Sequence, residues 1–123
     1  MSKRKILLVD DSNTVLMMVT MALSASGYAV VTAHDGAEGV AMAVSEQPDL
    51  ILLDIVMPKM SGIEACRLIR AHAATASIPI IMVTTRSEAV NVETCFANGC
   101  NDYVNKPINK SELLTKVRAL LGG

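Results

Sequence analysis

The sequence predicts a doubly wound α/β fold, in which a parallel sheet is covered by helices on both faces. Two observations lead to this prediction. Short apolar runs recur along the 123 residues, and such runs are typical of strands buried on both faces. Helical patterns alternate with these runs, and this alternation favours right-handed crossovers between parallel strands.

The stretch DLILLDIVMPKMSG at 49–62 contains the most informative of these runs. Leu50 to Leu53 are apolar, and Asp54 places a carboxylate where the run ends. Pro58 then prevents a central strand or a helix from continuing. Open parallel sheets bind ligands outside the carboxyl ends of their strands, so Asp54 lies where such a fold places its chemistry. The alternative is an acidic residue that merely starts a loop.

The remaining strands and the first helix follow the same alternation. Strands are predicted at 6–9, 29–33, 50–53, 78–83 and 102–104. The first helix is expected to open at Ser12 and to end with Gly27 as its C-cap. Its apolar face is formed by Val15, Val19, Ala22 and Leu23.

Four further helices are predicted by capping boxes, in which a short polar side chain is followed three residues later by Glu. The pairs are Asp35–Glu38, Ser61–Glu64, Thr85–Glu88 and Asn109–Glu112. They predict helix starts near residues 36, 62, 86 and 110. The last helix carries an apolar stripe from Leu113 to Leu121 and ends at Gly122 and Gly123.

Length and composition favour a single domain over residues 1–123, with an aliphatic core. The chain is 51% hydrophobic and only 2% aromatic, with a formal net charge of −1. It lacks a long basic run, so we expect no direct nucleic-acid binding. No apolar run approaches the ~20 residues that span a bilayer, and the N-terminus has too few apolar residues for a signal peptide. We therefore expect a cytoplasmic protein without membrane insertion.

Several other reactive or unusual residues are expected to be structural. The three cysteines lack the paired spacing of zinc or redox sites, which favours small buried hydrophobes in a reducing compartment. They are Cys66, Cys95 and Cys100. The methionines at 17, 18, 21 and 42 are interpreted as core and surface filling. His34 and His72 are isolated, so they are expected at the surface.

Polar side chains follow four of the predicted strands. Asp10 and Asp11 follow the first, Asp54 the third, Thr84 the fourth and Lys106 the fifth. In a flavodoxin-like strand order, 2-1-3-4-5, these four strands are neighbours and their ends converge on one pocket. One ammonium cannot offset three carboxylates, because two unit charges ~4 Å apart repel by about 4 kcal/mol at an effective dielectric of ~20. This oxygen-rich set favours a divalent cation, Mg2+ or Mn2+.

The same pocket is suited to phosphoryl transfer. Asp11 and Asp54 are expected to bind the cation directly, and Asp10 directly or through water. Mg2+ takes part of its coordination shell from phosphates, and a carboxylate can act as the nucleophile and become an aspartyl phosphate. The cation and Lys106 would stabilise the transferring group. The Thr84 hydroxyl would donate a hydrogen bond to it.

The chain resembles the response-regulator receiver domains of the CheY-like family over its whole length. The matching motifs are VDDS at 9–12, D-x-x-M-P-x-M-x-G at 54–62, V-T-T at 83–85 and Y-x-x-K-P at 103–107. The resemblance implies that Asp54 is the phosphoacceptor. It also implies that Asp10 and Asp11 bind Mg2+, with the main-chain carbonyl of Val56 as a further ligand, and that Lys106 contacts the phosphoryl group.

The resemblance further implies a cis peptide bond between Lys106 and Pro107, and a switch formed by Thr84 and Tyr103. On phosphorylation the threonine would move toward the phosphate and the ring would turn inward. This would reshape the face made by the fourth helix, fifth strand and fifth helix.

The function implied by the resemblance is two-component signalling. The chain would accept a phosphoryl group from a histidine kinase or a histidine phosphotransfer protein and act on a downstream protein target. It would not be a turnover enzyme, because it would catalyse only its own phosphorylation and dephosphorylation.

Three other classes share some of these features. A phosphatase of the haloacid dehalogenase type needs a second Asp two positions after the nucleophile, where this chain has Val56. A flavodoxin binds a phosphate after its first strand, where Asp10 and Asp11 would repel it. The third class is a pseudo-receiver, an interaction module that is never phosphorylated. The intact set of acidic residues and Lys106 argues against it, but it remains the alternative.

Overall fold

Strands and helices alternate through residues 3–85 and 92–122, the part of the chain that the computed structural model describes. The strands are β1 (Lys5–Val9), β2 (Ala29–Ala33), β3 (Leu50–Asp54), β4 (Ile80–Thr85) and β5 (Asp102–Lys106). The helices are α1 (Asn13–Ala25), α2 (Gly36–Glu46), α3 (Gly62–Ala71), α4 (Val92–Ala97) and α5 (Lys110–Leu121). Every helix within these ranges is too short or too polar to cross a membrane.

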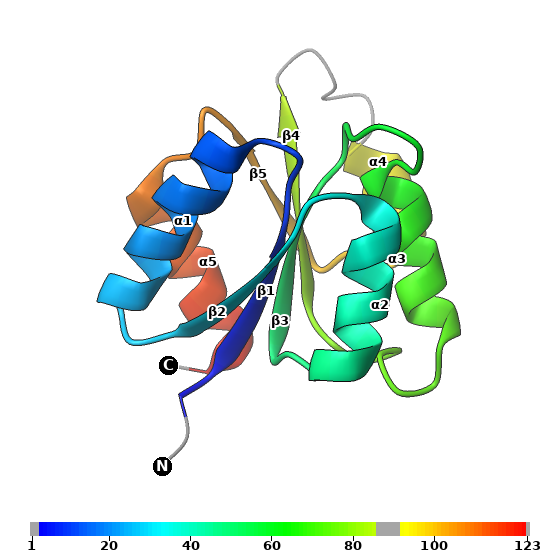
Figure 1. Ribbon diagram of the computed structural model, residues 1–123, viewed down its shortest axis with the longest axis horizontal. Helices are drawn as coiled ribbons and strands as arrows, with labels where there is room; N and C mark the ends of the chain where they lie inside the picture. The colour runs from blue at the N-terminus through cyan, green and yellow to red at the C-terminus, as the bar shows by residue number, and fades with distance from the viewer. Residues whose placement is uncertain (1–2, 86–91, 123) are drawn as a thin grey trace.

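The strands form one parallel sheet in the order β2-β1-β3-β4-β5, which confirms the predicted topology. Helices α1 and α5 cover one face of the sheet, and α2, α3 and α4 cover the other (Figure 1). Val9 pairs with Leu53, and Asp54 pairs with Val83, so the carboxyl ends of the central strands lie side by side.

The two faces of the sheet bury two separate apolar clusters, because successive strand residues point to opposite faces. Under α2, α3 and α4 lie Leu7, Val9, Ile51, Leu53, Ile80 and Met82. Under α1 and α5 lie Ile6, Leu8, Leu50, Leu52, Ile81 and Val83. All of these side chains are almost fully buried. Each such burial contributes about 1.5–3 kcal/mol, so the sheet is a rigid base for the residues at its carboxyl edge.

The predicted helix starts agree with the caps for α2, α3 and α5. The side chains of Asp35, Ser61 and Asn109 accept hydrogen bonds from the amides of Glu38, Glu64 and Glu112. In the first box the Glu38 carboxylate accepts from the His34 amide rather than from that of Asp35, so this box is not reciprocal. The predicted start near 86 and Glu88 lie outside the described residues.

The two strands nearest the C-terminus reach further than predicted. β4 includes Thr85 and β5 continues to Lys106, whereas the sequence pattern ended them at 83 and 104. The predicted start of β4 at residue 78 was wrong, because the strand begins at Ile80, after Pro79. Thr85 and Lys106 are paired in register, so the ladder continues past the apolar run. The apolar pattern misses these ends because the residues there are polar. The predicted C-cap of α1 was wrong by one residue: Ser26 is the C-cap, and Gly27 follows it with φ 95°, where glycine is favoured.

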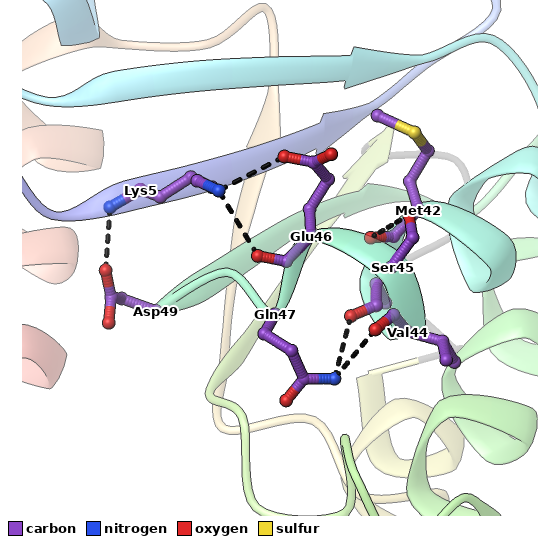
Figure 2. A network of polar contacts seen from close by, with 8 residues as sticks. Lys5, Met42, Val44, Ser45, Glu46, Gln47 and Asp49 are labelled. Atoms are coloured by element: carbon purple, nitrogen blue, oxygen red, sulfur yellow. Dashed lines mark hydrogen bonds and ion pairs between the residues drawn. The ribbon is translucent and has the colours of Figure 1, made fainter.

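A polar network fastens the opposite, amino-terminal edge of the sheet. The main-chain amide of Lys5 donates to Asp49 at 2.7 Å, and its ammonium lies 3.1 Å from the Glu46 carboxylate (Figure 2). Gln47 ends α2 in the left-handed region, with φ 47°, and its side-chain amide donates to the Val44 carbonyl. These contacts tie the start of β1 to the turn that leads into β3.

Candidate functional site

Three carboxylates and one ammonium meet at the carboxyl edge of the sheet. Asp10 follows β1, Asp54 ends β3 and Lys106 ends β5. One oxygen from each of Asp10, Asp11 and Asp54 lies within 4.8 Å of the others. The Lys106 Nζ atom lies 3.1 Å from Asp10 Oδ2 and 3.3 Å from Asp54 Oδ2. The parallel strands thus bring these four predicted site residues together.

The two adjacent acidic residues after β1 have different environments. Asp10 is 1% exposed, and its Oδ1 atom accepts a hydrogen bond from the Ser12 amide at 2.8 Å. Its other oxygen contacts Lys106, so both oxygens have partners. Asp11, in contrast, is exposed. The pocket therefore has a fixed inner carboxylate and an outer one that faces solvent.

The pocket retains an excess of negative charge. Burial, followed by repulsion from Asp10, raises the pKa of Asp54 from 3.8 to about 6, although Lys106 opposes the shift. Burial would lower the pKa of Lys106, but the carboxylates of Asp54 and Asp10 outweigh it and raise that pKa. A single ammonium therefore does not neutralise this site, and a cation that binds there competes with a proton on Asp54.

Two further predicted residues lie beside the acidic cluster. Thr84 is 1% exposed on β4, and its hydroxyl donates to the Thr85 carbonyl at 3.2 Å. That hydrogen bond must break before the hydroxyl can donate to another group. Val56 follows the end of β3, and its side chain is 53% exposed. The expected cis peptide bond between Lys106 and Pro107 is present.

The family model of the response regulator receiver domain matches residues 6–118 of the chain. The chain belongs to this family. Protein PilH of Pseudomonas aeruginosa is 40% identical to this receiver over 119 residues, which cover 97% of this chain and 98% of PilH. The chemotaxis protein CheY4 of Vibrio cholerae matches with a TM-score of 0.92 and 34% identity, over 98% of this chain and 100% of that one.

A third similar protein is known with a metal. It is the receiver domain of the sensor histidine kinase PA1611 from Pseudomonas aeruginosa PAO1, whose crystal structure has a magnesium ion coordinated in the active site cleft. This receiver matches it with a TM-score of 0.91 and 32% identity, over 99% of this chain and 100% of that one. The receiver spans about half, 48% to 52%, of the transcriptional and DNA-binding regulators that it also matches.

The aromatic residue of the expected switch is held by two side chains that sequence reasoning missed. Tyr103 of the receiver is partly buried on β5. The ring of Phe96 on α4 meets it edge-on, with centroids 6.3 Å apart, and the Lys116 Nζ atom on α5 lies 4.9 Å from its centroid. Lys116 also donates to the Tyr103 carbonyl and pairs with Asp102 at 3.2 Å. Nothing in the local sequence pattern links these distant positions.

The two expected switch residues share one face of the sheet. Tyr103 pairs with Met82 in the ladder between β4 and β5. Thr84 is two residues beyond Met82, so it points to the same face. This face is the one covered by α2, α3 and α4. Thr84 and Tyr103 are therefore diagonal neighbours across two strands, a spacing over which long side chains interact.

The cysteines have the expected structural environment. Cys66, Cys95 and Cys100 are free thiols and are buried. Burial raises the pKa of each thiol, to about 12 for Cys100, so each stays protonated and unreactive as it stands. His34 and His72 are exposed, as expected, and His34 contacts Glu38 at 3.1 Å.

The methionines of α1 are more exposed than a filling role requires. Met17, Met18 and Met21, which we call the α1 methionine surface, are 61%, 48% and 67% exposed. The helix NTVLMMVTMALSA carries no charged residue. Beside it lies an apolar pocket of about 140 Å³, lined by Val15, Met18, Val19, Lys106, Pro107 and Ile108. The apolar surface of α1 thus extends to the lysine of the acidic pocket.

Proposed function

We propose that this receiver accepts a phosphoryl group on Asp54 in a Mg2+-dependent reaction and signals through protein contacts. The main support is the acidic pocket itself. The carboxylates of Asp10, Asp11 and Asp54 are grouped there, and the Lys106 ammonium contacts those of Asp10 and Asp54. The donor is a histidine kinase or a histidine phosphotransfer protein, and the target is another protein. We place this reaction in the cytoplasm.

The chemistry of the pocket fits a divalent cation. Within the described ranges, these three aspartates form the group of acidic, histidine or cysteine side chains close enough to hold a metal ion. Carboxylate oxygens suit Mg2+, and Mn2+ is also compatible. Asp11 and Asp54, with the Val56 carbonyl, would hold the ion, and Asp10 would bind directly or through water. When bound, the ion supplies the positive charge that the pocket lacks and draws phosphoryl oxygens toward Asp54.

The reaction requires Asp54 in its ionised form. A carboxylate oxygen of Asp54 attacks phosphorus, and the new P–O bond forms as the bond from phosphorus to the donor's leaving group breaks. The Lys106 ammonium, 3.3 Å from Asp54, transfers one of its contacts to a phosphoryl oxygen. The Thr84 hydroxyl leaves the Thr85 carbonyl and donates to the same group. Water can later attack the aspartyl phosphate, so the domain reverses its own modification.

The output is a change at the face made by α4, β5 and α5. Movement of Thr84 toward the phosphoryl group frees space beside Tyr103, because the two lie on one face of adjacent strands. The ring then turns inward and loses its contacts with Phe96 and Lys116. Phosphorylation adds negative charge at Asp54, and this change shifts the equilibrium between two conformations that already interconvert. The downstream protein binds one of them.

Intact mass after incubation with acetyl phosphate and Mg2+ tests this function. We expect a single phosphoryl adduct, and no adduct when the metal is removed with a chelator. A folded, Mg2+-binding protein that takes no phosphoryl group from acetyl phosphate or from histidine kinases would contradict the proposal. That outcome would favour the pseudo-receiver.

We infer that the donor protein docks over the α1 methionine surface, because one apolar pocket is lined both by Met18 of this surface and by Lys106 of the acidic site. We expect Met18→Glu to slow transfer from a cognate donor protein by at least about tenfold, since a charge in the centre of an apolar interface costs ~2 kcal/mol or more. Phosphorylation by acetyl phosphate should stay within about twofold of the wild type. Stopped-flow or quench-flow transfer assays would measure both rates.

Leu68→Glu is a matched control for this prediction. Leu68 is 38% exposed on α3, which lies on the other face of the sheet from α1. Its replacement introduces the same charge at another exposed apolar position. If Met18→Glu slowed transfer no more than Leu68→Glu, the docking surface would lie elsewhere.

A further inference from the structure

We propose that Gly62 is a positioning residue for the phosphoacceptor. Because Gly62 has no Cβ atom, the first turn of α3 can press against the main chain at Asp54 and hold the direction of its carboxylate. The inference rests on the proposed function and deepens it.

The approach of α3 to the end of β3 leaves no room for a side chain. Gly62 is the first residue of α3, after the N-cap Ser61. A Cβ atom on Gly62 would overlap the carbonyl oxygen of Asp54 and lie 2.8 Å from its carbonyl carbon. Both are main-chain atoms, so no side-chain rotation can relieve the contact. Either the peptide after Asp54 or the start of α3 would have to move.

The two peptide groups on either side of the Ile55 Cα atom, just after Asp54, are each held by a hydrogen bond in the native chain. The Gly62 amide donates to the Ile55 carbonyl at 2.8 Å. The Ile55 amide donates to the Val83 carbonyl of β4 at 3.1 Å. The segment just after Asp54 is thus clamped between α3 and β4.

A shift of this clamp changes where the carboxylate points. The Asp54 side chain branches from the Cα atom that adjoins the clamped peptide, so rotation of that peptide carries the carboxylate with it. The carboxylate now lies 3.3 Å from Lys106 and within 4.8 Å of the other two acidic groups. Misplacement of a reacting group by about 1 Å can cost roughly 100-fold in rate. Gly62 therefore acts on phosphorylation through Asp54, not by contact with the phosphoryl group.

The chain offers a matched control in Gly36. It is also the first residue of a capped helix, α2, and its N-cap is Asp35. A Cβ atom on Gly36 would lie 3.0 Å from the Met60 side chain and from its carbonyl oxygen, so it needs a shift of only a few tenths of an ångström, less than Gly62 requires. Gly36→Ala thus makes the same chemical change at the same helix position without a contact to Asp54.

The decisive experiment compares Gly62→Ala and Gly36→Ala in the 123-residue chain. We expect Gly62→Ala to form the acetyl phosphate adduct at least about tenfold more slowly than the wild type, with a severalfold weaker Mg2+ affinity by calorimetry. Gly36→Ala should stay within about twofold on both measures. Thermal unfolding establishes that both variants fold. Equal losses in the two variants, or a wild-type rate in Gly62→Ala, would overturn the inference.

Amide hydrogen exchange of the wild type tests the clamp without any variant. The first four amides of a helix have no partner within it, so protection of the Gly62 amide reports its bond to the Ile55 carbonyl. We expect protection like that of the Ile55 amide. Exchange at the rate of an unstructured peptide would overturn the inference, even if Gly62→Ala did not fold. If the wild type accepted no phosphoryl group, the proposed function would fail. Amide hydrogen exchange at Gly62 and the Mg2+ affinity of Gly62→Ala would still test whether α3 positions Asp54.

Discussion

We expect Asp54→Asn to abolish the phosphoryl adduct and to leave the fold intact. An amide of the same shape has no anionic oxygen to attack phosphorus. The change does not alter the apolar strand beneath it, where residues 50–53 are buried. Intact mass with acetyl phosphate and Mg2+ measures the effect, and Asp49→Asn, at the other end of β3, is the matched control. An adduct that persisted in Asp54→Asn would show that another residue is the acceptor.

The same variant should be more stable than the wild type at neutral pH without metal. Burial and the charge of Asp10 raise the native pKa of Asp54 to about 6, above its ordinary value of 3.8. The native state therefore binds this proton more tightly than the unfolded state, and wild-type stability falls as pH rises from 3.8 through 6. A pKa shift of this size lowers the wild-type free energy of unfolding by roughly 3 kcal/mol above pH 6. The Asn variant has no such proton to lose, so its stability does not fall in this way.

Urea unfolding at several pH values measures this difference. We expect Asp54→Asn to exceed the wild type by up to roughly 3 kcal/mol above pH 7, and the gap to close near pH 4. Mg2+ should narrow the gap at neutral pH, because a ligand at 100 times its Kd adds about 2.7 kcal/mol to the protein that binds it. A wild type that gained stability relative to the variant as pH rose would contradict the charge balance described here.

Lys106→Ala is expected to uncouple phosphorylation from output more than to block it. The Lys106 Nζ atom contacts both Asp10 and Asp54, and removing it leaves these two carboxylates without their ammonium partner. Asp54 and the metal-binding oxygens remain, so the adduct should still form with Mg2+. The phosphoryl group, however, would lose the contact that draws β5, and with it Tyr103, into the new conformation. The dependence of partner binding on phosphorylation should fall by at least about tenfold.

Two measurements on one sample test this uncoupling. Intact mass gives the phosphorylated fraction, and the ring resonances of Tyr103 report whether the switch has turned. Lys110→Ala is the control, because Lys110 is an exposed lysine at the start of α5. If Lys106→Ala bound its partner in a fully phosphorylation-dependent way, the proposed role of Lys106 would be wrong. Without metal, we also expect Lys106→Ala to be less stable than the wild type, since it leaves buried carboxylates unpaired.

Local sequence patterns were enough to predict parallel strands that alternate with helices, and a flavodoxin-like strand order then predicted that the acidic residues meet. Apolar runs of four or five residues require strands buried on both faces, and the helices between them make those strands parallel. Asp10, Asp54 and Lys106 follow such runs, and parallel strands end at one edge of the sheet. Their convergence thus follows from local patterns together with the order of the strands in the sheet. The N-caps Ser61 and Asn109 were equally predictable, because capping depends on residues three positions apart.

The tertiary structure alone decided how these residues differ from one another. Asp10 is buried and Asp11 exposed, although they are adjacent and chemically identical, because only Asp10 points toward the Ser12 amide and Lys106. The contact of Gly62 with the main chain of Asp54 likewise depends on how closely α3 packs on β3. Burial, charge neighbours and backbone approach are set by residues distant in sequence, so no local pattern encodes them.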